Sequence, residues 1–305
     1  MRIDRLSPTH APSRIEQFHS MTGWGLDAVE LNCTLQAEGP LPPGCVAVVL
    51  ILRANDSSLC GVKAEDGAVV VFPPGTTVAA NVIPGFSCVG ATVPASVWAA
   101  AQSIESGIVT ERRPDHVSIR RLPAGCLAAI ERQLDRTIVQ LRAAEGDASA
   151  VMNEHVNLLA RSFADGADAA RSNRGAAKTH LRQARRARDW IHAHIDDAIR
   201  IADLCAALGT SRRQLEYAFR GTFDVSPREY IYALRLNQIR RALLRREKNE
   251  VSVTDIALLY GVTHLGRFAA GYRDLFGELP SQTRKSPRAD MGLVSFSRSP
   301  RPQEN

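Results

Sequence analysis

The sequence predicts a protein of class α+β, with a β-rich N-terminal part and an all-helical C-terminal domain. Short runs of alternating or β-branched residues, separated by Gly- and Pro-rich turns, occupy residues 1–122. Apolar residues at helical spacing take over from residue 123, and no strand pattern interrupts them between 179 and 285. Charge divides the chain in the same way. Residues 174–288 hold 22 Lys and Arg against 12 Asp and Glu, whereas the remainder holds 16 against 20.

The first 122 residues are predicted to form short strands with tight turns between them. The expected elements are strands over residues 27–35, 45–52, 68–72 and 87–93 and a short helix over residues 94–102. Clusters of Gly and Pro, such as EGPLPPG and PPGT, separate these runs. Strands joined in this way are typical of a small barrel or sandwich, of which a cupin-like barrel is one form.

A helical hairpin is predicted over residues 123–165. Its first helix carries one apolar stripe, which consists of Leu127, Ile130, Leu134, Ile138 and Leu141. A second helix is expected from about residue 147 to residue 164, after the EGD turn. The sequence leaves two uses of the stripe open: packing on the β-rich part of the same chain, or forming a dimer interface.

Three further segments complete the predicted organisation. Residues 166–178 are small and polar and are expected to form a linker, part of it helical. Residues 179–288 are expected to form a separate helical domain, and the tail at 289–305 is expected to be disordered. The net charge of +10 over residues 174–288 favours a polyanionic partner for this domain.

An internal near-repeat lies within the helical part. IADLCAALG (201–209) aligns with VTDIALLYG (253–261), so that Cys205 and Ala257 each precede a glycine by four positions. Two helices that cross at a steep angle need a small residue where their backbones approach, and a glycine permits the sharp turn between them. The spacing therefore predicts two helix-turn-helix units, a motif whose second helix enters the major groove of DNA.

The second helix of the first unit carries most of the candidate DNA-contacting side chains. Ser211 is placed to cap this helix and itself lies beside the predicted DNA surface, and Leu215 is expected to face the core. The outward positions are then those of Arg212, Arg213, Gln214 and Tyr217. Because Arg and Gln can form bidentate hydrogen bonds with base edges, this helix is the predicted base reader.

The second unit and the helix between the units supply fewer candidates. The outward side chains of the second unit are His264 and Arg267, so weaker base readout is expected from this half. His264 is expected to contact a phosphate or to cap its helix. The intervening helix, expected over 227–246, would fix the spacing of the two readers. Arg240 and Arg241 near its end are expected either to contact phosphates or to lie in solvent.

The sequence offers little support for an enzyme or a membrane protein. It contains no GxSxG, HExxH, P-loop or GxGxxG motif, and its six cysteines are scattered without metal-ligand spacing. The N-terminus lacks the apolar stretch of a signal peptide, and the longest apolar run, VAVVLIL, is too short to cross a bilayer. We therefore expect a cytoplasmic, non-enzymatic protein with no cofactor and no metal.

Three segments of the C-terminal third follow a known pattern. They are DLCAALGTSRRQLEYAFRGTFDVSPREYIYALRLNQIRRALL, VTDIALLYGVTHLGRFAAGYRDLF and the closing FGELPSQTR. Together they cover about residues 185–285 and resemble the AraC/XylS family of transcription regulators. DLCAALGTSRRQLEYAF and RLNQIRRALL are most similar to the subgroup that contains ethanolamine-operon regulators. Asp224 replaces a usual glycine of the family, and Val262 and Thr283 replace aromatic residues, which is expected to thin the core of the second unit.

The resemblance implies a regulator, usually an activator, that binds double-stranded DNA near promoters as a homodimer and acts on RNA polymerase. A small-molecule effector in the front half is a further expectation. Its pocket could use Trp24, Phe72, Phe86 or Trp98, although core packing is the favoured role for each. A protein–protein adaptor with a basic helical domain is the alternative from a different functional class.

Overall fold

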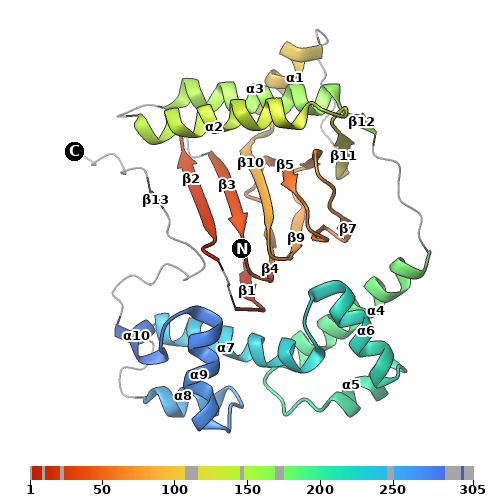
Figure 1. The fold of residues 1–305 in the computed structure, drawn as a ribbon, viewed down its shortest axis with the longest axis vertical. Coiled ribbons are helices and arrows are strands. Elements are labelled where there is room, and N and C mark those ends of the chain that lie inside the picture. Colours follow the sequence, from red (N-terminus) through yellow and green to blue (C-terminus); the bar gives the residue numbers. More distant parts are fainter. Residues whose placement is uncertain are drawn as a thin grey trace.

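The computed structural model describes the chain in eight stretches. They cover residues 2–8, 11–20, 24–106, 116–144, 148–168, 175–245, 251–285 and 297–298. The N-terminal part is β-rich and the C-terminal part is helical, which confirms the predicted fold class. A layer of helices lies on one side of the β-rich part, and the helical domain lies on the other (Figure 1).

The strands form two sheets, and every described strand pairing is antiparallel except that of β13 with β2. The smaller sheet has the order β1 (Arg2–Arg5), β4 (Leu35–Pro40), β9 (Thr77–Val82), β6 (Ser58–Leu59), β7 (Val62–Lys63). The larger has the order β12 (Ala167–Asp168), β11 (Ser118–Arg121), β8 (Ala68–Phe72), β5 (Cys45–Arg53), β10 (Phe86–Pro94), β3 (Gly25–Leu31), β2 (Arg14–His19), β13 (Ser297–Arg298).

The two sheets pack face to face as a sandwich, with β5 near the middle of the larger sheet. Ala47 and Ile51 of this strand lie in the core between the sheets, whereas Val48 and Leu50 lie in the core beneath the helices. Successive side chains of a strand point to opposite faces, and here both faces are covered. This explains why CVAVVLIL is apolar throughout. Of the two predicted architectures, a barrel and a sandwich, the structure shows the sandwich.

Three helices cover the outer face of the larger sheet: α1 (Ala95–Ser106), α2 (Leu127–Ala143) and α3 (Ser149–Asp165). The predicted stripe of α2 packs here, because Leu134, Ile138 and Leu141 are buried in the same cluster as residues of the sheet. The Arg142 guanidinium of α2 also lies 2.6 Å from the Glu16 carboxylate on β2. The stripe therefore serves the fold of its own chain.

The four aromatic side chains considered for an effector pocket are core residues. Trp24 and Trp98 lie in the cluster beneath the helices, and Phe72 and Phe86 lie between the two sheets. All four are buried. Burial in these clusters fits close packing of the rings against neighbouring core side chains.

The front half differs from the sequence prediction at several strands. The strand expected over 27–35 is two strands, because β3 belongs to the larger sheet and β4 to the smaller, with the chain crossing between them at residues 32–34. β1, β2, β9 and β11 were not predicted. Their sequences mix charged, small and apolar residues, which gives no clean alternation.

The described residues of the C-terminal domain form helices, as the sequence predicts, and the helix expected over 227–246 is α7 (Pro227–Arg245). The helices are α4 (Gly175–Ala193), α5 (Ile201–Leu208), α6 (Arg212–Phe223), α7, α8 (Val253–Leu259), α9 (Leu265–Phe276) and α10 (Pro280–Lys285). α4 begins inside the stretch expected to be a linker. The predicted disordered tail at 289–305 lies outside the described residues, apart from the two that form β13.

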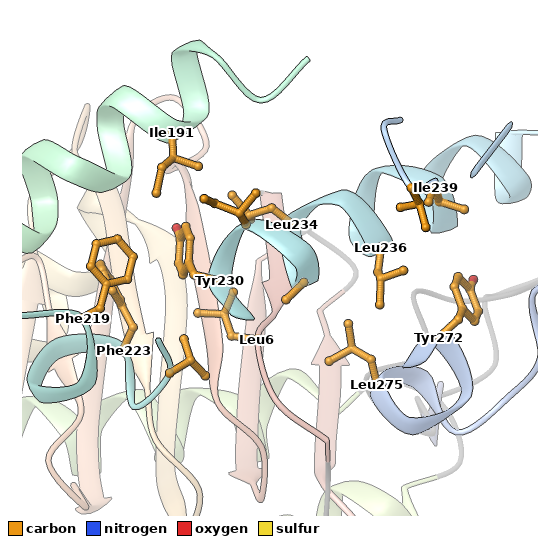
Figure 2. Packing of buried hydrophobic residues seen from close by; sticks show 14 of the residues in the cluster. Leu6, Ile191, Phe219, Phe223, Tyr230, Leu234, Leu236, Ile239, Tyr272 and Leu275 are labelled. Carbon is orange, nitrogen blue, oxygen red and sulfur yellow. The ribbon is translucent and has the colours of Figure 1, made fainter. Parts of the chain in front are cut away.

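The N-terminal segment joins the two parts of the molecule. Leu6, which follows β1, is buried in the core of the helical domain beside Phe223 and Leu234 (Figure 2). The Asn237 side chain on α7 accepts a hydrogen bond from the Arg5 N–H at 3.1 Å and donates one to the Arg5 carbonyl at 2.8 Å. Because an amide can satisfy both backbone groups of a strand residue, Asn237 holds β1 on α7.

The substitution Leu6→Ala should destabilise the helical domain. It removes a buried side chain from the core around α7, so it leaves a cavity and should cost about 3 kcal/mol of unfolding free energy. Thermal unfolding followed by the helical circular dichroism signal measures this cost. Leu6→Met, which keeps the volume, should change the midpoint little. Equal midpoints for wild type and Leu6→Ala would show that Leu6 is not a core residue.

Acid should destabilise the β-rich part through His155 of α3. This ring is 1% exposed, has no hydrogen-bond partner within the described residues, and burial lowers its pKa from 6.5 to about 4. The neutral ring is favoured in the fold, so its contribution is complete above pH 6.5 and is lost as the pH falls toward 4. Wild type should lose up to about 3 kcal/mol in this window relative to His155→Leu, as measured by denaturant unfolding. Parallel pH profiles for the two proteins would contradict this.

Candidate nucleic-acid interface

The turn of the first helix-turn-helix unit has the geometry that the sequence predicts. Gly209 adopts φ +60° and ψ +40°, the left-handed conformation that favours glycine. Its N–H donates to the Ala206 carbonyl at 3.3 Å, and the Thr210 N–H donates to the Cys205 carbonyl at 3.0 Å. These bonds end α5 and turn the chain directly into α6.

Ser211 caps α6, as predicted, and does so together with Gln214. The Ser211 hydroxyl accepts from the Gln214 N–H at 3.2 Å, and the Gln214 amide oxygen accepts from the Ser211 N–H at 3.2 Å. This reciprocal arrangement is a capping box, which satisfies two backbone donors at the start of the helix. Gln214 is exposed, but its amide oxygen is committed to the cap, a role that the sequence analysis did not foresee.

The outer face of α6 is polar, aromatic and open. Leu215, Ala218 and Phe219 are fully buried on the opposite face, which fixes the orientation of the helix. The outer face forms a shallow concavity lined by Arg212, Arg213, Glu216, Tyr217 and Arg220. Three of the predicted base readers therefore lie together on one accessible surface, with Tyr217 65% exposed.

Arg220 belongs to this surface and was missed by the sequence analysis. It lies seven residues after Arg213 and three after Tyr217, so helical periodicity could have found it. Its guanidinium is 3.8 Å from the Glu216 carboxylate and 3.9 Å from that of Glu229. Both pairs are long and exposed, so they constrain the arginine weakly.

The second helix-turn-helix unit has the same arrangement as the first, with fewer charged side chains on its outer face. Gly261 has φ +73° at the end of α8, and Phe268 and Tyr272 are buried on the inner face of α9. His264 is the N-cap residue of α9, but its side chain makes no capping hydrogen bond. The prediction that the His264 ring caps its helix is therefore wrong. His264 and Arg267 are both exposed at the start of the helix.

Arg240 does not lie on the predicted DNA surface. Its side chain is 7% exposed, and its guanidinium lies 2.6 Å from the Glu278 carboxylate and 4.8 Å from the centre of the Phe276 ring. The Thr283 hydroxyl donates a hydrogen bond to the Glu278 carboxylate at 2.6 Å. The same hydroxyl lies 2.9 Å from the Tyr272 hydroxyl. The threonine that replaces a family aromatic thus joins a buried polar network instead of thinning the core.

Arg241 is also engaged elsewhere. Its guanidinium lies 2.7 Å from the carboxylate of Asp4 on β1, a residue that is itself buried. The expected phosphate or solvent role of this side chain is therefore replaced by a contact between the helical domain and the β-rich part. Neighbours in the sequence could not reveal this, because the partner lies 237 residues away.

The substitution Arg240→Ala should act on stability. It removes charge-assisted hydrogen bonds beneath α10 and should cost about 2 kcal/mol of unfolding free energy, measured by denaturant titration. Because the guanidinium is shielded, the salt dependence of DNA binding by the folded variant should match that of wild type. If the variant showed a weaker salt dependence of DNA binding and unchanged stability, Arg240 would instead be a phosphate contact.

Comparison with known proteins supports this geometry. A family model described as a helix-turn-helix domain matches residues 204–286. The XylDLEGF operon transcriptional activator of Pseudomonas putida is 36% identical over 102 residues, which cover 33% of this chain and 32% of that protein. The probable thc operon regulatory protein of Rhodococcus erythropolis is 33% identical over 94 residues, or 31% of this chain and 28% of that protein.

A solved structure is also similar in this region. It is a probable AraC family transcriptional regulator from Rhodopseudomonas palustris, 34% identical, with 34% of this chain and 94% of that chain covered and a TM-score of 0.33. Residues 204–286 of the helical domain therefore form a helix-turn-helix domain similar to those of these regulators. The match spans about a third of the length of the two curated relatives.

The described residues of the helical domain and of the β-rich part show no feature of a metal centre or of a membrane-spanning helix. Within the residues that the structure describes, no three His, Cys, Asp or Glu side chains gather as metal ligands would. Over the same residues, every helix is too short or too polar to cross a bilayer.

Proposed function

We propose that this protein is a sequence-specific DNA-binding transcription regulator that inserts α6 and α9 into successive major grooves. The observation that carries the proposal is the outer face of α6, where Arg212, Arg213 and Tyr217 are exposed on a helix whose other face is buried. Arginine is the side chain best suited to hydrogen-bond the guanine edge in the major groove. Two such helices on one duplex face would meet grooves about 34 Å apart.

In this proposal α6 supplies most of the base recognition. Arg213 is the candidate for a bidentate contact with guanine, with Arg212 and Tyr217 beside it and Ser211 near the phosphates. Arg267 is the counterpart on α9, where His264 stands at the helix start and can approach a phosphate. The first unit should therefore discriminate between sequences more strongly than the second.

The substitution Arg213→Ala should relax base preference at one position of the bound sequence. Loss of a bidentate contact should cost about 1–3 kcal/mol on the preferred duplex and little on a duplex already changed at that base pair. Fluorescence anisotropy on a selected duplex and its single-base variants measures both. Arg228→Ala, an exposed arginine of α7 outside the reading face, is the matched control.

The outcome that would contradict this assignment is an equal loss of affinity on every duplex. Such a result would make Arg213 a phosphate contact. If the folded wild-type chain showed no salt-sensitive binding to any duplex, the DNA-binding proposal itself would fail, and the adaptor alternative would take its place.

Several finer properties extend the proposal. Activation through RNA polymerase is in keeping with the names of the P. putida and R. erythropolis relatives, which are described as an operon activator and an operon regulator. We place the protein in the cytoplasm, where DNA and polymerase are found. The ethanolamine-regulator subgroup is supported by the segments DLCAALGTSRRQLEYAF and RLNQIRRALL.

Dimerisation and effector binding concern the front half of the chain. A homodimer would have to use a surface other than the buried stripe of α2, and Val139 is exposed on the same helix. A small-molecule effector would need a space other than one lined by the four buried aromatic rings. A groove of about 350 Å³ between α2 and the larger sheet, bordered by Leu134, Val89 and Arg53, is the most suitable place.

A further inference from the structure

We propose that α4 forms a second DNA-contacting surface beside α6, in which Arg182 and Arg186 bind backbone phosphates. The inference rests on the proposed function, since it adds a phosphate contact to the same DNA-binding surface. It goes beyond that function because α4 belongs to neither helix-turn-helix unit. In helix-turn-helix proteins the second helix of the motif contacts base edges and determines sequence preference. Neighbouring elements contact the phosphates that border the groove.

The two arginines line a groove next to the turn of the first unit. The groove has a volume of about 260 Å³, with Arg182 and Arg186 on one side and Gly209, Thr210 and Gln214 on the other. The side chains that α4 contributes to its lining are all polar or charged. A shallow cationic groove of this kind suits a chain of phosphates better than an enclosed small molecule.

Contacts between α4 and α6 hold this groove in a fixed position. The Gln183 amide donates a hydrogen bond to the Thr210 hydroxyl in the turn. One turn earlier on α4, the His180 ring packs edge-on against the Tyr217 ring, with 4.8 Å between the ring centres. Since Tyr217 lies on the outer face of α6, α4 borders the reading helix along that face.

The arginines of α4 fall into two groups according to their partners. Arg188 lies 2.6 Å from the Asp189 carboxylate, and the Arg185 guanidinium lies against Gly61 of the β-rich part. Arg182 and Arg186 are exposed, lie four residues apart on one helix face, and have no ion pair with any described residue. Two unpaired cations beside the predicted base reader are therefore available for phosphates.

The test is the salt dependence of DNA binding by the full-length chain. The double variant Arg182→Gln with Arg186→Gln should lower the steepness of log K against log salt concentration by about 1.8, since each phosphate contact contributes about 0.9 on B-DNA. The ratio of affinities for a selected duplex and a scrambled duplex should stay unchanged.

A matched control separates this contact from a general effect of charge. Arg132→Gln with Arg136→Gln removes the same charge at the same four-residue spacing from exposed positions on α2. It should leave the salt dependence as in wild type, and thermal unfolding should show that both double variants are folded.

The inference is overturned if the α4 variant keeps the wild-type salt dependence, or if the α2 variant changes it equally. Absence of salt-dependent binding by wild type would instead overturn the proposed function, and the inference with it.

Discussion

The burial of α7 is the constraint on which the rest of the DNA-binding geometry depends. Near its start, Tyr230 packs against Phe219 and Phe223 of α6, with ring centres 5.4 and 5.0 Å apart. Toward its other end, its buried side chains meet Tyr272 and Leu275 of α9 (Figure 2). Because both units pack on one regular helix, the separation of α6 and α9 follows from its length and not from a linker. A pre-set separation means that little freedom is lost when both helices bind.

The same helix ties the DNA-binding units to the β-rich part. β1 lies along α7, the Tyr230 hydroxyl donates to the Gln36 side chain on β4, and Asn81 on β9 donates to the Thr222 carbonyl at the end of α6. Separating the two parts would exchange these hydrogen bonds for hydrogen bonds with water and would expose the apolar side chains beside them. The β-rich part therefore contacts directly the helix on which both helix-turn-helix units pack.

The local features of the site could be predicted from the sequence, whereas those that depend on partners far away in the chain could not. The turn at Gly209, the cap at Ser211 and the inward Leu215 follow from conformational and periodic rules within a dozen residues. The Arg240 and Arg241 side chains form ion pairs with Glu278 and Asp4, and no local sequence pattern connects these partners. The N-terminal strand was missed for the same reason, because its apolar neighbour Leu6 completes a core formed by residues far along the chain.

Hydroxyl-radical footprinting on a selected duplex tests most directly whether α7 holds two groove-reading helices at a fixed spacing. The account predicts two protected patches on one face of the DNA, about 10–10.5 base pairs apart from centre to centre, with the patch assigned to α6 the more strongly protected. A single patch, or two patches whose separation varies between bound sequences, would contradict it.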